Sequence, residues 1–571
     1  MDREAELIIR GGTVVDGLGG EPYEADVAIG AGHILAVGKL GPTPRGAEEI
    51  DARRMLVTPG FVDIHTHYDA QATWSSRLDS SSWHGVTTAL MGNCGVGFAP
   101  CLPDRRDSLV ALMEGVEDLP EVVLTEGLPW NWESFPDFLD VLGARKYDMD
   151  VATQVPHAAL RIHVMGQRAS DHEQATPADR AEMARLATES ITAGALGVST
   201  SRALAHKTLD GRHTPTLHAA EEELADIGRA LGRLGRGWLQ VNSDFDEPEE
   251  EFAMLRRVAE ASGRPLIFSL LQREKAPSLW RFLLDRIEEA NAAGTSISGQ
   301  IMARPIGLML GFELSQNPFM DRASWQQVTK LPIAERLALL RNPEFRARLI
   351  AEPTMDPVIA SRLNNWRAVF PLGDPPEYEP SPEQSIAAIA ARRGMDAQEL
   401  AYDLMLENNG RGILNRPIIN YADGDLAAVK TMVEHPNTLM GLGDGGAHVG
   451  FICDASSTTS MITHWTRDRS RGERLPLGFV VRRLTHDNAR ALGLADRGAI
   501  APGLRADINV IDYDRLRVRS PELVYDLPAG GKRLLQRADG YVATIVNGQP
   551  VYREGEATGA LPGRLVRGGT A

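Results

Sequence analysis

The middle of the chain alternates between amphipathic helical stretches and short apolar runs, and this alternation constrains the fold most strongly. A capping signal at Thr176 precedes the first stretch. Repeated strand and helix units of this size require a parallel sheet with right-handed crossovers. Helices are predicted over 177–194, 221–232, 249–263 and 279–294.

About eight strand segments can be counted in this region. Eight units favour a closed (β/α)8 TIM barrel. An open doubly wound sheet that binds a nucleotide is the alternative, but no Gly-rich phosphate loop follows an early strand. The segments are 61–65, 87–93, 195–199, 238–242, 266–271, 296–301, 417–421 and 438–443.

The two ends of the chain are rich in β-branched residues and glycine turns, among them Asn547-Gly548. We expect 1–57 and 497–571 to pair into one small β-sandwich domain, with 58–496 forming the barrel. The stretch 304–374 shows no clear repeat, and irregular connections of this length are commonly lids or binding loops. The sequence therefore predicts a lid-like insertion there, with a surface insertion as the alternative.

Composition narrows the possible partners. The formal net charge of −17 argues against nucleic acid or an anionic membrane surface. No run of 18 apolar residues is present, so no membrane span is expected. Three cysteines are too few, and odd in number, for a disulfide framework. These features predict a cytoplasmic enzyme that acts on a small molecule.

The motif GFVDIHTHYDA, residues 60–70, carries the clearest chemistry. Alternate side chains of a strand share one face, so His65 and His67 point to the same side. At the carboxyl end of a barrel strand, two neutral imidazoles converge where barrel enzymes place their sites. The pair is predicted to chelate a first-row transition metal.

Two further motifs follow apolar strands. Cys94 lies between glycines in MGNCGVGFAP, where it can present a thiolate to a metal, although an inert buried cysteine is the alternative. Cys101 and Cys453 are assigned to that inert class. Asp444 enters the Gly-rich turn of GLGDGGAHVG, where it can bind a metal and accept a proton. His448 is either a substrate contact or a loop histidine.

Together with DRGAIAPGLRADINVID near the C-terminus, these motifs resemble the amidohydrolase superfamily, and within it the N-acyl-D-amino-acid deacylase branch. The resemblance covers most of the chain. It implies zinc bound by His65, His67, Cys94 and Asp444, with Asp444 as general acid and base. It further implies hydrolysis of an amide (C–N) bond in an N-acyl amino acid-like substrate by metal-activated water, and a homo-oligomer.

The sequence departs from this family in two places. The family carries further metal-binding histidines on two later strands, but 238–245 and 266–272 contain no histidine. We therefore expect one zinc ion rather than two. The family's basic residues for the substrate carboxylate are also missing from the matching stretches. The remaining candidates for substrate binding are Arg202, Asn242, Gln272 and His448.

Two other functions stay open. The same barrel and metal could serve a hydrolase of cyclic amides, lactones or carbamates, or a deaminase. A low-activity relative retained as a binding protein is the second alternative, because the missing histidines are a loss of chemistry. The intact set of His65, His67 and Asp444 favours an active enzyme.

Overall fold

The computed structural model describes residues 4–568, with two parallel sheets at its centre, one of three strands and one of six. Strand β8 leads through a single residue into β9, and a bridge between Thr66 and Gly445 joins the segments after β6 and β17. The series of pairings thus returns to its first strand. The strands are β6 (Phe61–Asp63), β7 (Val86–Met91), β8 (Asp150–Thr153), β9 (Val155–Pro156), β10 (Val198–Arg202), β11 (Leu239–Ser243), β12 (Leu266–Ser269), β13 (Ile297–Ile301) and β17 (Thr438–Met440).

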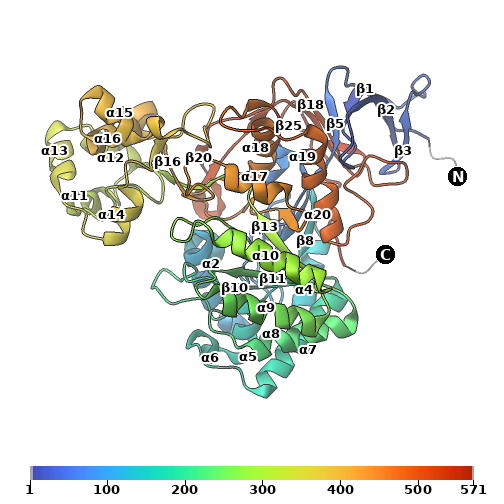
Figure 1. Ribbon diagram of the computed structural model, residues 1–571, viewed down its shortest axis with the longest axis horizontal. Helices are drawn as coiled ribbons and strands as arrows, with labels where there is room; N and C mark the ends of the chain where they lie inside the picture. The colour runs from blue at the N-terminus through green and yellow to red at the C-terminus, as the bar shows by residue number, and fades with distance from the viewer. Residues whose placement is uncertain (1–3, 569–571) are drawn as a thin grey trace.

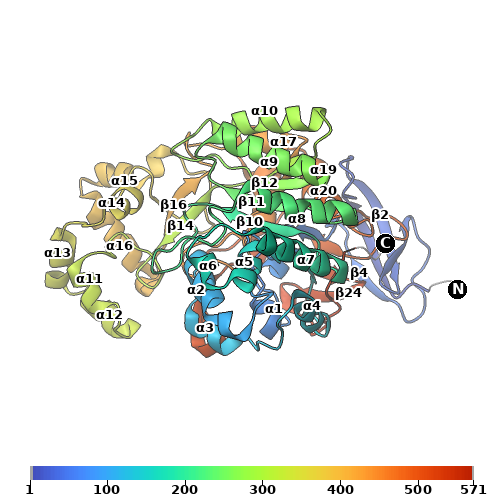
Figure 2. The same cartoon turned by 90° about the horizontal axis from the view of Figure 1, so that it is seen from below.

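Helices follow the parallel strands and cover them from outside, as Figure 2 shows for α7 to α10 beside β10 to β12. All four predicted helices are present, with ends within two residues of the prediction. The capping box is present too, because Thr176 Oγ1 accepts from the Asp179 amide at 3.2 Å. Within 4–568 no helix has the length and apolar character needed to cross a membrane. The covering helices are α5 (His157–Met165), α7 (Pro177–Ala193), α8 (Glu221–Leu234), α9 (Pro248–Ser262) and α10 (Leu279–Ala292).

One predicted barrel strand is wrong. Residues 417–421 overlap β16 (Leu414–Ile419), which pairs antiparallel with β14 (Ile306–Leu310) in a separate small sheet. The strand that the sequence did not indicate is β8, which pairs with β7 and leads into β9, whereas β13 and β17 pair directly with each other. Strand β8 is short and starts with a buried carboxylate, Asp150, whose burial is compensated by distant Arg497 and Arg505. An acidic residue of this kind looks like a loop residue until its partners are known.

The two ends of the chain pair in one nine-stranded sheet, which lies at one side of the molecule in Figure 1. Its N-terminal and C-terminal parts meet where β5 runs antiparallel to β18, with Val57 opposite Val510. Buried aliphatic side chains from both ends form its core, including Ile9 and Ile508. The strands are β1 (Leu7–Val14), β2 (Tyr23–Gly30), β3 (His33–Gly38), β4 (Glu48–Asp51), β5 (Leu56–Pro59), β18 (Ile508–Ile511), β23 (Tyr541–Val546), β24 (Gln549–Arg553) and β25 (Glu556–Ala557).

The stretch 304–374, in which the sequence showed no clear repeat, contains β14 and several short helices joined by irregular segments. It belongs to a larger insertion that runs from β14 to β16 and projects from one side of the molecule in Figures 1 and 2. The insertion has a core of its own, in which Phe312 packs against Trp325 and Tyr402. Short helices broken by prolines hid its periodicity. They are α11 (Ala323–Val328), α12 (Ile333–Leu340), α13 (Pro343–Ala351), α14 (Pro357–Leu363), α15 (Ile386–Arg393) and α16 (Ala397–Gly410).

Candidate metal centre and active site

The predicted metal ligands lie at the carboxyl ends of three parallel strands. His65 and His67 follow β6, Cys94 follows β7, and Asp444 follows β17. The Nε2 atom of His65 lies 3.4 Å from Cys94 Sγ and 3.4 Å from Asp444 Oδ1. The Nε2 atom of His67 lies 3.7 Å from the same carboxylate oxygen. The structure thus brings His65, His67 and Cys94 into one cluster, and Asp444 Oδ1 lies within 3.7 Å of both imidazoles.

Glycines shape the turn that presents the thiol. Cys94 has a positive φ of 54°, and Gly92 and Gly95 flank it with φ of 81° and 70°. A Cβ atom at Gly92 would lie 2.2 Å from the carbonyl oxygen of Gln154, and one at Gly95 would lie 2.8 Å from Thr200 Cα. The turn therefore packs directly on the neighbouring strands, and only glycine fits at either position.

Burial sets the charge state of these groups. It lowers the pKa of His65 to about 4, so the imidazole is neutral and available as a ligand. Burial raises the pKa of the Cys94 thiol, and the nearby carboxylates of Glu117 and Asp444 raise it further. Burial, Asp454 and Asp63 also raise the pKa of Asp444. The centre therefore gathers acidic groups whose ionised forms require a positive charge.

A divalent cation fits this donor set. Four-coordinate zinc with bonds of about 2.0–2.3 Å separates its ligand atoms by roughly 3.3–3.8 Å, and the three measured contacts of 3.4, 3.4 and 3.7 Å agree. One donor atom from each of His65, His67 and Cys94 lies within 4.8 Å of the other two. Asp444 Oδ1 is buried and has no hydrogen-bond partner among the described residues. Thiolate and imidazole together favour zinc over magnesium or calcium.

Two ligands are oriented by side chains from other strands. Gln300 on β13 lies with Oε1 2.7 Å from His65 Nδ1, which leaves Nε2 to face the centre. Asn242 on β11, a predicted substrate contact, instead donates from Nδ2 to Cys94 Sγ at 3.8 Å. The same nitrogen lies 3.3 Å from Nε2 of His206, which follows β10. Gln300 could have been found as a polar residue at a strand end.

Glu117, at the end of α2 (Arg106–Glu117), is a site residue that the sequence analysis missed. Its Oε1 lies 3.3 Å from His67 Nδ1, and its Oε2 lies 3.6 Å from His448 Nε2. Burial and the charge of Asp444 raise the pKa of Glu117. No motif surrounds this residue, so no local signal could have indicated it. His448 faces the centre through this contact.

The other two predicted substrate contacts are engaged elsewhere. The guanidinium of Arg202 binds the Glu251 carboxylate, with Nε 2.6 Å and Nη2 3.2 Å from its oxygens. Gln272 donates from Nε2 to Asp423 at 2.7 Å and accepts at Oε1 from the Ala422 amide at 3.2 Å. Both roles in substrate binding stay predictions.

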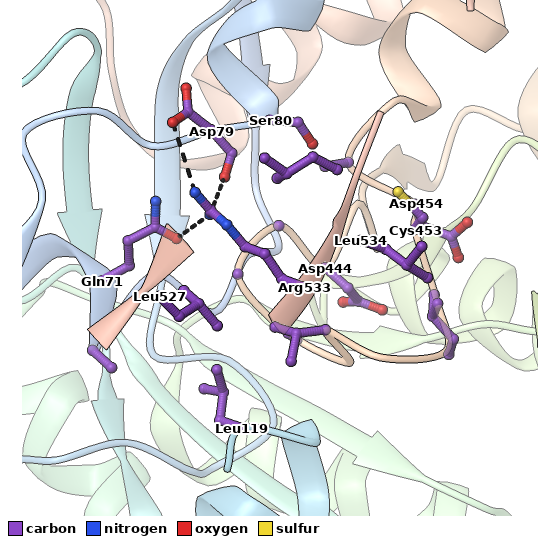
Figure 3. Close-up of a pocket in the computed structure, with 18 of the residues that line it drawn as sticks. Gln71, Asp79, Ser80, Leu119, Asp444, Cys453, Asp454, Leu527, Arg533 and Leu534 are labelled. Atoms are coloured by element: carbon purple, nitrogen blue, oxygen red, sulfur yellow. Dashed lines mark hydrogen bonds and ion pairs between the residues drawn. The ribbon is translucent and has the colours of Figure 1, made fainter. Parts of the chain in front are cut away.

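A small cavity of about 30 Å³ lies on one side of Asp444 (Figure 3). Arg533 reaches into it but is occupied, because it donates to Asp526 at 2.7 Å and to Gln71 at 3.2 Å. Arg533 also contacts the backbone oxygen and the carboxylate of Asp79, as Figure 3 shows. A cavity of this size holds one or two water molecules but no substrate, which needs some 300 Å³ or more.

Two imidazoles, a thiol and a carboxylate at the ends of parallel strands define a metal-dependent hydrolase. Residues 48–552 match the model of the amidohydrolase family. The chain belongs to the amidohydrolase family, as the sequence resemblance predicted, and it is an enzyme that hydrolyses carbon–nitrogen bonds other than peptide bonds.

Three known proteins are similar to this chain over nearly its whole length. It is 26% identical to the N-acyl-D-glutamate deacylase of Alcaligenes xylosoxydans xylosoxydans, covering 99% of this chain and 97% of that one. A solved N-acyl-D-glutamate deacylase from Bordetella bronchiseptica, complexed with zinc and a phosphonate inhibitor, has a TM-score of 0.64 at 23% identity, over 99% and 100% of the chains. A solved D-aminoacylase with a binuclear metal centre has a TM-score of 0.63 at 24% identity, over the same shares. The structural likeness shows a shared fold.

Proposed function

We propose that this chain hydrolyses the amide bond of an N-acyl amino acid, with one zinc ion held by His65, His67, Cys94 and Asp444. The convergence of these four side chains at strand ends carries the proposal. The relatives support the substrate class, since one is an N-acyl-D-glutamate deacylase and another a D-aminoacylase. Zinc is bound in one solved relative.

A bound divalent cation supplies two effects: it acidifies water and polarises a carbonyl group. Asp444 accepts the proton of the attacking water and returns it to the leaving nitrogen. His65 and His67 stay neutral because they are buried, and they keep their lone pairs for the cation. The contacts of Gln300 and Asn242 hold two of the ligands in place while the proton moves.

The architecture is part of the proposal. We infer that the parallel strands close into a (β/α)8 barrel spanning 58–496, because their pairings run from β6 round to the bridge between Thr66 and Gly445. We infer a small β-sandwich domain from the remaining segments, 1–57 and 497–571, because strands from both of them pair in one nine-stranded sheet. We propose the insertion that includes 304–374 as a lid, because its Ser315 amide donates to the carbonyl oxygen of Gly450 at 3.0 Å, in the loop that carries Asp444. A homo-oligomer and a cytoplasmic location stay predictions.

One ion is proposed rather than two. Asn242 occupies the end of β11 and Gln272 follows β12, where the family resemblance implies histidines. The D-aminoacylase relative is described as having a binuclear centre with activation by one metal and attenuation by the second. A single activating ion therefore agrees with the loss of the second set of ligands.

A second substrate class is favoured by one observation. Arg202, the cation predicted to bind a substrate carboxylate, is already paired with Glu251. This arrangement favours substrates without a free carboxylate, such as cyclic amides, lactones or carbamates.

The test is an activity panel on the purified enzyme with metal content measured in parallel. N-acyl-D- and N-acyl-L-amino acids, hydantoins, lactones and carbamates are compared before and after removal of the metal by a chelator. We expect about one zinc per chain and amide hydrolysis that disappears with the metal and returns with zinc. A fully active metal-free enzyme, or activity confined to another carbonyl class, overturns the proposal.

A further inference from the structure

Glu117 lies at the edge of the metal centre in surroundings that are unfavourable for a negative charge. Its side chain is only 1% exposed, and it ends α2, where the helix dipole is negative. Among residues 4–568, the ion-pair contacts of its carboxylate are limited to two imidazoles, those of His67 and His448. No arginine or lysine neutralises it there, so the carboxylate requires positive charge from another source.

The rest of the centre does not supply that charge. The thiol of Cys94, which is 7% exposed, and the carboxylate of Asp444, which is 13% exposed, are acidic groups as well. A buried ion without a compensating charge is strongly destabilising, even after the protein relaxes. A divalent cation bound by the four donors provides the missing charge, and its field reaches Glu117 through His67.

The position of Glu117 suits a specific role toward one ligand. Nε2 of His67 faces Asp444 at 3.7 Å. The opposite ring nitrogen, Nδ1, lies 3.3 Å from Glu117 Oε1, outside hydrogen-bond geometry, and has no hydrogen-bond partner among the described residues, so Glu117 is the carboxylate that can supply one. Carboxylates placed behind metal-binding histidines in this way fix the tautomer and the ring orientation, and they make the imidazole a stronger ligand.

The end of α2 is fixed firmly enough for this role. The carbonyl oxygen of Glu117 accepts from the His448 amide at 2.5 Å. The next residue, Asp118, accepts at Oδ2 from the Gly450 amide at 2.9 Å and from the Ser315 hydroxyl at 3.0 Å. Helix α2 is thereby joined to the loop that carries Asp444 and to the insertion.

We propose that Glu117 is a positioning residue of the metal centre, which orients His67 through Nδ1 and supplies negative charge that strengthens cation binding. The inference rests on the proposed function, since it requires that the four donors bind a metal. It adds a fifth residue, from helix α2, which lies outside the motifs.

The test compares Glu117→Gln with the wild type in zinc affinity, measured by chelator competition, and in melting temperature with and without zinc. Glutamine keeps the size of the side chain but removes its charge. We expect zinc affinity to fall about 10- to 100-fold. The metal-free variant is expected to melt at the same temperature as the metal-free wild type, because glutamine fills the same space and keeps a polar group at the same position.

Two further variants complete the design. Glu117→Asp keeps the charge but withdraws it from His67, so an intermediate loss of affinity is expected, also if the glutamine variant fails to fold. Glu126→Gln removes an exposed glutamate from α3 (Glu121–Gly127) and should change neither quantity.

Unchanged zinc affinity in the Glu117 variants overturns the inference. So does an equal loss of stability with and without zinc, which is the behaviour of a purely structural residue. If the wild type itself binds no zinc, the proposed function fails first, and the two failures are distinguished before any variant is made.

Discussion

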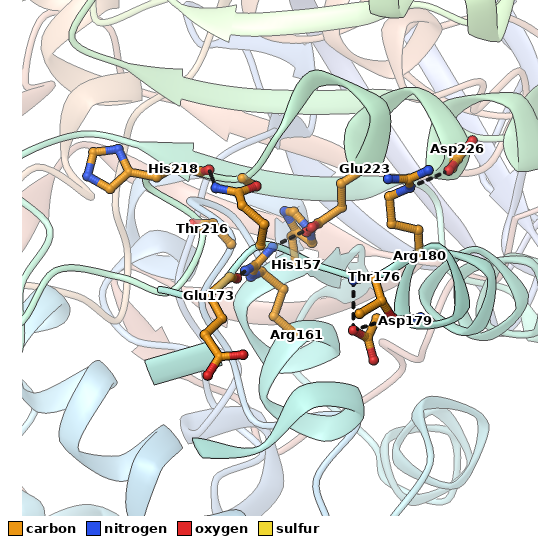
Figure 4. A network of polar contacts seen from close by, with 12 residues as sticks. His157, Arg161, Glu173, Thr176, Asp179, Arg180, Thr216, His218, Glu223 and Asp226 are labelled. Carbon is orange, nitrogen blue, oxygen red and sulfur yellow. Dashed lines mark hydrogen bonds and ion pairs between the residues drawn. The ribbon is translucent and has the colours of Figure 1, made fainter. Parts of the chain in front are cut away.

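Two buried polar clusters lie at the ends of neighbouring strands and differ in how their charges are paired. In the cluster of Figure 4, which follows β9, Glu223 meets Nε2 of His157 at 2.6 Å and also binds Arg161. The second nitrogen of His157 lies 2.9 Å from the Thr200 hydroxyl. Every polar atom of this glutamate and this histidine has a protein partner. In the metal centre, the ion-pair contacts of the Glu117 carboxylate within residues 4–568 are to two imidazoles.

The two buried glutamates shift in opposite directions. Burial raises the pKa of Glu223, but the hydrogen bond and charge of His157 and the charge of Arg161 outweigh it and hold the pKa below its ordinary value. Burial raises the pKa of Glu117, and no cationic side chain reverses the shift. A buried acid that the protein itself neutralises indicates a structural role. A buried acid left without a cation indicates a ligand site.

The largest effect on activity is expected in the metal centre. Asp444→Asn removes the proton acceptor, and kcat for the preferred substrate of the activity panel should fall about 10²- to 10⁴-fold. Zinc content should fall less, since three ligands remain. Metal analysis and steady-state kinetics on the same preparation separate the two effects, with Asp285→Asn on the surface of α10 as control. Unchanged turnover removes Asp444 from the mechanism.

The paired cluster should respond in stability instead of catalysis. Glu223→Gln leaves Arg161 and His157 without their carboxylate, which should lower the free energy of unfolding by about 3–5 kcal/mol. Zinc affinity should stay as in the wild type. Chemical unfolding and chelator competition measure the two quantities, and Glu222→Gln, one position away and exposed, is the matched control. A large loss of zinc affinity with normal stability would reverse the assignment of the two clusters.

Lowering the pH should remove the stabilisation by Glu223 gradually, without a substitution. The pKa of Glu223 in the folded protein lies below its ordinary value of 4.5, so its stabilisation is present above about pH 4.5. It is lost as the pH falls through the lower, folded pKa. The stability difference between the wild type and Glu223→Gln should therefore be constant from pH 7 to 5 and shrink below pH 4.5. A difference that grows in acid contradicts this pairing.

Local motifs account for the part of the centre that the sequence predicted. His65 and His67 share one strand end, and strand geometry alone places them on one side. Cys94 and Asp444 each follow an apolar run with glycines beside them, and the ends of parallel strands converge. Gln300 has a weaker signal of the same kind, as a polar residue near the end of β13. Glu117 has none, because its approach depends on how α2 packs, which no spacing in the chain records.

The same distinction explains the errors in the fold. An isolated apolar run at 417–421 has the composition of a buried strand in any sheet. The sequence alone therefore could not show whether it belongs to the insertion or to the barrel. Strand β8 was missed because Asp150 at its start is acidic. Its two arginine partners lie 347 and 355 residues away. Pairing across such distances is a property of the folded chain.

The smallest effect concerns Arg202, which the sequence predicted to bind substrate and the structure pairs with Glu251. If the pairing is its role, Arg202→Gln costs about 1 kcal/mol of stability, because both partners are partly exposed and the ion pair is screened by water. The KM of the preferred substrate then changes little, and Glu251→Gln gives the same result as Arg202→Gln. Steady-state kinetics on both variants decide the question. A KM that rises tenfold in Arg202→Gln alone, equivalent to about 1.4 kcal/mol of lost binding, shows that this guanidinium leaves Glu251 to hold the substrate carboxylate.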